Sequence, residues 1–338
     1  MMNETEVTLV IPARDAAGTI DACLEAVDRV RLRPGSRLVR VIVVDDGSRD
    51  DTLERVRRHD VEILESGGRG AGAARNIGWR KATTPLVWFV DSDCEPEPEA
   101  LETLLGHLDD PEVSGVGGTY GIEDGASLLE RLIHEEIVAR HAHMKADVDF
   151  LATYDVLYRR DVLDELGGFD ERYLKGQDAE FAFRVLEAGH RLRFEHGSVV
   201  VHHHEQRLAR YLHIQRLQGY WRVALHIEHA GHSGGDSYSS LLDHVQPFLP
   251  VLVIASLVLL VVPWGWTVPL ACLSLLLLVQ LPRTIELIRR TGDPGMFAFV
   301  LMSTVRAFWR SAGLVQGVLD RLLRRGPIAP QRIGRSAG

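Results

Sequence analysis

The most informative residues of this chain are two carboxylates, Asp91 and Asp93, which follow the apolar segment Leu86–Val90. Such a segment is typical of a buried strand in a parallel sheet, and alternate residues of a strand point to the same side. Asp91 and Asp93 should therefore leave the carboxyl end of the strand together, where open α/β sheets bind ligands. Two oxygen ligands there suit Mg²⁺ or Mn²⁺ carrying a diphosphate. The alternative is that both acids only cap a turn through residues 94–98.

A second pair of carboxylates, Asp45 and Asp46, follows the apolar segment 39–44. The carboxyl ends of parallel strands meet at one edge of a sheet, so these acids should lie near Asp91. A carboxylate there can accept a hydrogen bond from the N3–H of a uracil-type base or from a ribose hydroxyl. The alternative is that one of them is the N-cap of a helix expected from Thr52.

A glycine-rich loop at residues 67–72 opens a helix that is expected to run through Lys81. Glycines let the backbone approach a phosphate, and the N-terminus of a helix favours anions. The loop matches neither the Walker A pattern nor the dinucleotide fingerprint. Arg75 on this helix is a candidate contact for a phosphate or a base, and the alternative is a solvated helix face.

Asp178 and the segment His202–His204 are the remaining candidates for chemistry. Asp178 begins a segment of helical spacing, and its carboxylate suits a general base that takes a proton from an acceptor hydroxyl. The alternative for Asp178 is a helix N-cap. His202 and His204 share one face of the strand that they end, and a neutral imidazole is a suitable third ligand for Mn²⁺. The alternative is a solvated histidine cluster.

The elements around these residues alternate between strand and helix patterns, which predicts an α/β sheet of Rossmann type. Further along, residues 149–160 and 192–201 have strand character, and residues 178–188 have helical spacing. In the first part of the chain the expected strands are 7–11, ended by Pro12, 39–44, 61–64 and 86–90, and the expected helices are 19–30, 52–59 and 70–81.

The composition argues against several classes of protein. A net charge of −9 over 338 residues argues against general nucleic-acid binding. Cys23, Cys94 and Cys272 are far apart in sequence, so they indicate neither a zinc site nor a disulfide framework, and they fit a reducing compartment. The polar N-terminus leads directly into a strand, and no signal peptide is expected.

The C-terminal part differs in character, because the segments 248–262 and 267–281 are apolar and uncharged. One helix across both would be ~50 Å long and would exceed a ~30 Å hydrocarbon core, so a transmembrane helical hairpin is expected. Each arm is shorter than the usual ~20 residues of a span, so a re-entrant hairpin is also compatible with the sequence. Trp264 and Trp266 at the turn fit an interfacial aromatic belt. The alternative is a buried hairpin in a soluble domain.

Arginines around the hairpin predict its orientation. Three arginines between residues 283 and 290 follow the second arm, and three more lie between residues 321 and 325. The positive-inside rule therefore predicts that both ends of the hairpin are cytoplasmic. Residues 296–319 are apolar but contain Arg306 and Arg310, which predicts an amphipathic helix on the membrane surface. Residues 211–226 are a second candidate for the interface, and an ordinary surface helix is the alternative.

Taken in order, the motifs resemble those of the inverting glycosyltransferases of family 2, which have the GT-A fold. The resemblance covers roughly residues 7–205, and it is the ordered set that is specific. The C-terminal hairpin is similar to that of membrane-anchored members. The matching segments are VTLVIPA at 7–13, VIVVDDGS at 41–48, GAGAARNIG at 70–78, FVDSD at 89–93 and GGFDE at 167–171.

The resemblance implies a role for each candidate residue. Two positions depart from the family pattern. Gln177 replaces the Glu of a Glu-Asp pair, which concerns the positioning of the acceptor. Asp155 stands where an Asn is common, which concerns recognition of the sugar. The implied catalytic base is Asp178, the donor-binding residues are Pro12, Asp45, Asp46, Arg75, Asp91 and Ser92, the metal ligands are Asp91, Asp93 and His202, and the acceptor residues are Asp155 and Gln177.

The resemblance also implies an activity. We expect a membrane-associated enzyme that uses Mn²⁺ or Mg²⁺ to move a sugar from a nucleotide-diphospho-sugar to a hydroxyl of a lipid-linked or membrane-bound acceptor. A UDP-sugar is the first expectation, and a GDP- or dTDP-sugar is the alternative. The alternative functions are a polyprenyl-phosphate glycosyltransferase and a non-catalytic nucleotide-sugar-binding partner of a membrane complex.

The expected organisation is a GT-A domain followed by a membrane-anchoring region. The domain would span residues 1–235 and the anchoring region residues 236–338, with the hairpin at about 248–281 and the amphipathic helix at about 296–320. The catalytic domain and the C-terminus would lie on the cytoplasmic side of the cell membrane.

Overall fold

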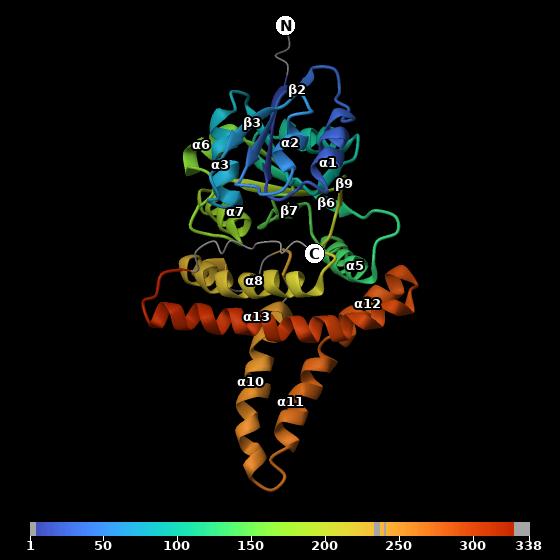
Figure 1. Cartoon of the computed structure of the whole chain (residues 1–338). Coiled ribbons are helices and arrows are strands. Elements are labelled where there is room, and N and C mark those ends of the chain that lie inside the picture. The colour runs from blue at the N-terminus through green and yellow to red at the C-terminus, as the bar shows by residue number, and fades with distance from the viewer. Residues whose placement is uncertain (1–4, 233–236, 240, 328–338) are drawn as a thin grey trace.

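The computed structural model describes residues 5–232, 237–239 and 241–327, and the chain folds in layers (Figure 1). A sheet with flanking helices forms one layer, two long helices cross beneath it, and a helical hairpin extends away from them. The strands of the described residues are β1 (Thr5–Ala13), β2 (Ser36–Asp45), β3 (Glu62–Glu65), β4 (Leu86–Val90), β5 (Cys94–Pro96), β6 (Val113–Gly121), β7 (Asp147–Val148), β8 (Asp155–Arg159) and β9 (Arg191–His202).

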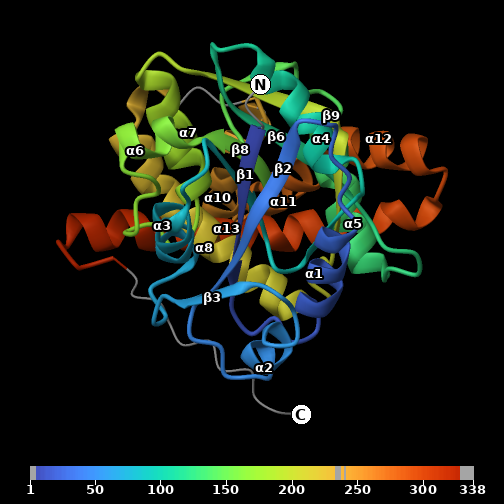
Figure 2. The same cartoon turned by 90° about the horizontal axis from the view of Figure 1, so that it is seen from above.

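The helices follow the expected alternation in the first part of the chain and dominate the last part. Figure 2 shows the sheet from above, with α3 on one side of the first strands and α1 on the other. The helices are α1 (Ile20–Asp28), α2 (Thr52–Val56), α3 (Ala71–Lys81), α4 (Ala100–Leu105), α5 (Leu128–His141), α6 (Arg160–Leu166), α7 (Gln177–Glu187), α8 (Leu208–Glu228), α9 (Leu241–Val245), α10 (Leu249–Ser256), α11 (Thr267–Leu278), α12 (Leu281–Thr291) and α13 (Ala298–Leu322), with 3₁₀ turns η1 (Gly106–Asp109), η2 (Ala230–His232), η3 (Gln246–Phe248), η4 (Leu257–Val261) and η5 (Pro294–Phe297).

The first half of the sheet is parallel, as the sequence predicts, and its strand order is β3-β2-β1-β4. The carboxyl ends of β2 and β4 therefore lie at one edge of the sheet. The predicted end of the first strand at Pro12 is wrong, because β1 continues to Ala13 and Pro12 lies opposite Val44. Pairing of β1 with β4 ends at Val10, so no strand on that side needs an N–H at position 12.

The second half of the sheet is mixed. Strand β8 is antiparallel to β4 and β6, whereas β9 is parallel to β6. Residues 94–96, expected to be a turn, form β5, which is antiparallel to β9 and places Cys94 opposite His202. This register connects the end of β4 to the end of β9.

Helices α8 and α13 lie side by side beneath the sheet and approach each other closely (Figure 1). A Cβ added to Gly219 of α8 would lie 2.2 Å from the carbonyl oxygen of Arg310, and one added to Gly313 of α13 would lie 1.9 Å from that of Arg216. Glycine is therefore required at this contact. One side of α8 is covered, because α13 packs along it and because Tyr220 and Trp221 pack against Tyr173, and the membrane-interface interpretation of residues 211–226 stays a prediction.

A helix on the surface of a water-soluble protein usually exposes its polar face, whereas α13 exposes an apolar face. Its polar residues Ser303 and Arg306 are buried against the rest of the protein. Its outward face is apolar and includes Leu301, 69% exposed, and Trp309, 41% exposed. A helix is thus present where the amphipathic helix was expected, and its buried face combines these polar residues with the apolar Phe299 and Met302.

Helices α10 and α11 lie side by side and form an apolar hairpin with η4 and the turn at residues 262–266 (Figure 1). Much of its surface is exposed, and Val261 is 85% exposed and Trp264 75% exposed. Of the described residues, one helical stretch, Thr267–Thr291, is long and apolar enough to cross a membrane, and Phe248–Val261 is a shorter apolar helix. The expected boundary at residues 235/236 lies outside the described residues.

Candidate active site

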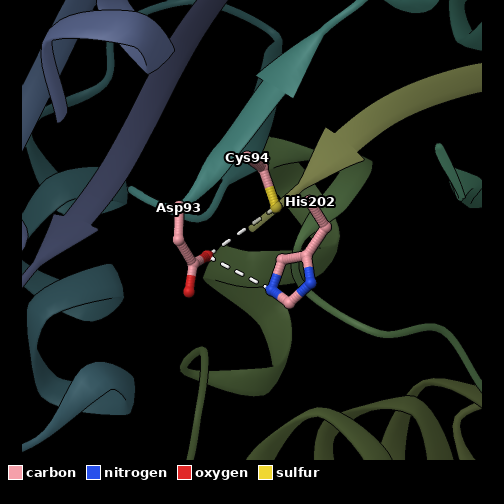
Figure 3. A group of neighbouring side chains, drawn as sticks. All are labelled: Asp93, Cys94 and His202. Carbon is pink, nitrogen blue, oxygen red and sulfur yellow. Dashed lines mark hydrogen bonds and ion pairs between the residues drawn. The ribbon is translucent and has the colours of Figure 1, made fainter. Parts of the chain in front are cut away.

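The pairing of β5 with β9 brings Asp93 to His202 (Figure 3). Because Cys94 lies opposite His202, the preceding Asp93 has its carboxylate Oδ1 3.6 Å from His202 Nε2 and 3.8 Å from Cys94 Sγ. One ligand atom from each of the three residues lies within 4.8 Å of the others. Asp93 and His202, predicted to share a metal, are thus neighbours, and Cys94 is a third neighbour that the sequence did not predict.

The electrostatics of this cluster favour an oxygen and nitrogen donor set. Burial acts to raise the pKa of Asp93, but the charge and hydrogen bond of His202 outweigh it and lower the pKa to about 2. Asp93 is therefore a carboxylate at neutral pH. Burial raises the pKa of Cys94 well above the ordinary thiol value, so Cys94 is a protonated thiol in the absence of a metal. A carboxylate with an imidazole fits Mn²⁺ well, since Mg²⁺ binds mainly to oxygen.

Asp91 has a different partner. Arg75 Nη2 donates to Asp91 Oδ1 at 2.5 Å, and the Asp91 carboxylate does not join the cluster of Asp93 and His202. Arg75 is only 3% exposed, so the interpretation of a solvated helix face is wrong. Its Nε and Nη1 atoms are buried without a hydrogen-bond partner, which is costly and points to a group that binds there.

Asp46 and Asp45 are both buried at the end of β2, and neither caps α2. Asp45 accepts hydrogen bonds from the backbone of Gly47 and Ser48, which shapes the turn after the strand. Asp46 accepts from the Gly70 N–H at 3.0 Å in the glycine-rich loop. Asp46 therefore ties that loop to the sheet edge, and two further partners that the sequence did not predict, Arg14 and Ser66, also contact it.

Asp178 lies one residue inside α7, so its interpretation as an N-cap is wrong. The N-cap is Gly176, whose φ of +83° lies in the left-handed region that favours glycine. The Asp178 carboxylate accepts from the N–H of Ala179 at 2.9 Å. Burial raises the pKa of Asp178, although the positive charge of Arg75 acts in the opposite direction. Asp178 is thus a partly buried carboxylate within the influence of Arg75.

The two predicted acceptor residues have different environments. Gln177 is 8% exposed, and its Oε1 atom is buried without a hydrogen-bond partner. Asp155 is fully buried, accepts from Trp88 Nε1 at 2.8 Å and from Ser198 Oγ at 2.7 Å, and has its pKa raised by burial to about 6. Its contacts lie inside the sheet, and the geometry does not favour direct contact with an acceptor.

The histidines separate as strand alternation predicts. His202 and His204 are hydrogen-bonded to each other through their Nδ1 atoms at 2.8 Å, whereas His203 contacts Glu95. His204 is buried against His134 of α5, so the interpretation of a solvated cluster does not hold for it. His202 is therefore the histidine that faces Asp93.

The predicted donor-binding residues Pro12 and Ser92 are placed by backbone contacts of their segments. Pro12 is buried in β1 next to Ala13, whose carbonyl accepts from the Asp46 N–H at 2.7 Å. The Ser92 carbonyl accepts from Thr19 Oγ1 at 2.9 Å. Their roles toward a donor stay predictions.

Asn76 is a positioning residue that sequence reasoning missed. Its side chain donates to the carbonyl of Phe169 at 2.7 Å and accepts from the N–H of Phe169 at 2.9 Å. It also accepts from Trp79 Nε1 at 3.0 Å. Asn76 thus fixes the loop before α7 on α3, and its place directly after Arg75 in a glycine-rich helix start was the available signal.

Comparison with known proteins agrees with this architecture. Residues 8–167 match the family model described as Glycosyl transferase family 2. The chain is 34% identical over 222 residues to the pre-mycofactocin glycosyltransferase of Mycobacterium tuberculosis, a match that covers 60% of this chain and 44% of that protein. It is 30% identical over 205 residues to the glycosyltransferase AglE of Haloferax volcanii, covering 58% of this chain and 66% of that protein.

A solved structure extends the likeness in fold. The mannosyltransferase PcManGT of Pyrobaculum calidifontis, solved in complex with GDP-Man and Mn²⁺, superposes with a TM-score of 0.58 and 20% identity over 93% of this chain and 87% of that chain. Residues 8–167 are thus similar to glycosyl transferase family 2, and the chain has a mixed α/β sheet of GT-A type with flanking helices. Its match spans less than half of the length of the mycobacterial relative.

Proposed function

We propose that the protein is an inverting glycosyltransferase that uses a nucleotide-diphospho-sugar and a divalent metal. The observation that carries this proposal is the meeting of Asp93 with His202 next to the Arg75–Asp91 pair. It supports a site for a metal-bound diphosphate, because it combines an ionised carboxylate, an imidazole and a buried guanidinium that has unpartnered N–H groups.

Each residue has a defined task in this proposal. Asp46 is suited to hold the nucleoside beside the glycine-rich loop, and Asp93 with His202 would hold Mn²⁺ or Mg²⁺. A divalent ion there supplies positive charge opposite the leaving diphosphate. Asp178 takes the proton of the acceptor hydroxyl, whose oxygen then bonds to the anomeric carbon from the face opposite the diphosphate. The bond to the diphosphate breaks, and the sugar is transferred with inversion.

The identity of the donor is the first point to test. We expect one class among UDP-, GDP- and dTDP-sugars to raise the melting temperature of the purified protein in the presence of Mn²⁺, because a ligand stabilises the state that binds it. The same donor should give a smaller shift with the Arg75→Met variant, in which the buried guanidinium is lost. If no nucleotide sugar changes the melting temperature with either metal, the proposed donor class is contradicted.

We further propose that the C-terminal region attaches the protein to a membrane. Two features support this: the exposed apolar hairpin and the outward apolar face of α13 (Figure 1). Large contiguous apolar surfaces are rare on soluble monomers and mark interaction sites. The hairpin is directed away from the sheet, so α13 would lie along the bilayer surface while the hairpin enters it. The region of residues 236–338 would then be the anchor, and residues 1–235 the catalytic domain.

The orientation and the acceptor are parts of the same proposal. By the positive-inside rule, the arginines that flank the hairpin support a cytoplasmic position for the catalytic domain and the C-terminus. The stretch Thr267–Thr291 is long enough to cross a ~30 Å hydrocarbon core, whereas Phe248–Val261 is shorter, so both a spanning and a re-entrant hairpin are compatible with the structure. A lipid-linked or membrane-bound acceptor would meet the catalytic domain at this surface.

The attachment is tested best with the full chain, because removal of α13 would expose the face of α8 that it covers. We expect the full-length protein to stay in the membrane pellet after alkaline carbonate extraction. Arginine at both Ile254 and Leu275, one in each arm, should weaken insertion, since a charged side chain at the centre of a membrane helix costs ~2.5–3.5 kcal/mol. Leu128→Arg, at an exposed apolar position of α5, is the matched control. Recovery of the unmodified protein in the soluble fraction would contradict the anchor.

A further inference from the structure

Helix α5 separates two buried groups of polar side chains. On one side, His134 Nδ1 is hydrogen-bonded to His204 Nε2 at 3.3 Å, and His204 in turn contacts His202. On the other side, Glu136 and Arg140 are buried against the C-terminal helices. Residues 134 and 136 lie about 200° apart around a helix, which explains why they face opposite ways. One helix thus contacts both the candidate active site and the region that carries the hairpin.

Glu136 is the centre of the second group. Its carboxylate accepts hydrogen bonds from Arg306 of α13, with Nη2 at 2.9 Å, and from Arg140 Nη2 at 2.8 Å. Arg140 also donates to both oxygens of Asp243 in α9 at 2.7 Å. Burial acts to raise the pKa of Glu136, but Arg306 and Arg140 lower it to about 2, so the carboxylate is ionised. The geometry is thus that of a buried ion cluster in which the carboxylates of Glu136 and Asp243 are paired, while Arg306 Nε has no hydrogen-bond partner.

The cluster continues to the base of the hairpin. Arg306 Nη2 donates to Ser303 Oγ at 2.8 Å, and Ser303 donates to Gln280 Oε1 at 2.7 Å. Gln246 Nε2 donates to the same Gln280 oxygen at 2.8 Å. Gln246 lies in η3 before the first arm, and Gln280 lies directly after the second arm. A continuous chain of hydrogen bonds therefore connects α5 with the start and the end of the hairpin.

Arg306 is the link on which this chain depends. Its guanidinium contacts Glu136 of α5, Tyr211 of α8 and Ser303 of its own helix. A cavity of about 190 Å³ borders Arg306, Glu136 and Gln280, so the helices have room to shift if this link is lost. The glycine-based packing of α8 on α13 and the Arg131–Asp293 ion pair of α5 would survive such a loss, so the connection would loosen rather than break.

We propose that the Glu136–Arg306 pair is the joint that fixes the orientation of the catalytic domain relative to the membrane hairpin. The inference rests on the proposed function, because a fixed orientation holds the site at a set height above a membrane-bound acceptor. Arg306 and Glu136 act as positioning residues through α5, and they do not touch the donor. Loss of the pair loosens the connection without dismantling the active site.

Distances between two spin labels on the full chain in lipid nanodiscs test this proposal. One label is placed on native Cys272 of α11, and the other on a cysteine introduced at exposed Lys81 of α3, while Cys23 and Cys94 are buried. When Glu136 and Arg306 are both unmodified, we expect a single narrow distribution of the distance between the two labels. Glu136→Gln and Arg306→Met should broaden it or add a second population, and Arg306→Lys, which keeps the charge, should restore most of the narrow distribution.

Arg310→Met is the matched control, because Arg310 is on the same helix and donates to Gln215 of α8 rather than to α5. An unchanged distribution in both Glu136→Gln and Arg306→Met would overturn the proposal, as would equal broadening in Arg310→Met. If Arg306→Met fails to fold, the isosteric Glu136→Gln decides the outcome. Donor binding is measured on the same samples, so failure of the proposed function is recognised separately by the lack of a thermal shift.

Discussion

Replacement of Asp178 by asparagine is expected to lower the rate of transfer to a hydroxyl acceptor by ~10²–10⁴-fold, the usual contribution of a general base. Asparagine has nearly the same shape and can keep the hydrogen bond from the Ala179 N–H, but it cannot take a proton. Donor affinity should change little, because Asp46 and Asp93 are unaltered. The measurement is turnover and donor binding on the same purified variant.

The pH dependence of the rate gives a second test of the role of Asp178 as general base. The base is active as a carboxylate, and burial raises its pKa above the ordinary value for aspartate. The rate should therefore fall as the pH is lowered through that raised pKa, and the asparagine variant should lack this acid limb. Full turnover in the Asp178→Asn variant would contradict the role of Asp178 as the general base. It would favour an acceptor that is already ionised, as in a polyprenyl-phosphate glycosyltransferase.

Replacement of Asp93 by alanine is expected to reduce transfer by about 10³-fold. Metal stabilisation of a leaving diphosphate is worth several kcal/mol, and each ~1.4 kcal/mol is a factor of ten in rate. The fold should persist, because the Asp93 side chain is 47% exposed and lies at the sheet edge. Turnover and thermal unfolding of the variant separate loss of chemistry from loss of stability.

Two experiments test the metal site: chelation of the metal and replacement of the neighbouring Cys94. EDTA should abolish transfer by the unmodified protein, and Mn²⁺ should restore it. Because Mn²⁺ and Mg²⁺ prefer oxygen and imidazole ligands to thiolate, Cys94→Ala should leave the metal dependence unchanged, whereas a thiolate ligand would make that variant need more Mn²⁺. Full activity in EDTA would contradict the metal site.

The elements that local patterns specify were predicted well. The expected strand 86–90 is confirmed as β4, and the helix that starts in the glycine-rich loop ends at Lys81 as expected. These predictions succeed because the periods of strands and helices, and glycine at a helix start, are properties of neighbouring residues. The position of Asp91 and Asp93 at the carboxyl end of a strand follows from the same local pattern.

Contacts between distant segments were beyond such patterns. The sequence did not predict that residues 94–96 form a strand, because Pro96 and Pro98 favour a turn and only pairing with β9 makes the strand stable. That pairing decides that Asp93 meets His202. The capping role considered for Asp178 was also wrong, since the helix begins one residue earlier, at Gln177, and its N-cap is Gly176.

The sequence by itself determined the alternation of strands and helices in the first part of the chain and supplied the candidate residues and the family resemblance, because these depend on composition and on short-range spacing. Only the tertiary structure decided which partners the charged residues have. Arg75 turns inward to Asp91, and Arg306 turns inward to Glu136, although both were compatible with an exposed helix face. The physical reason is that a periodic pattern identifies the two faces of a helix, whereas the packing of the whole chain decides which face is covered and by what.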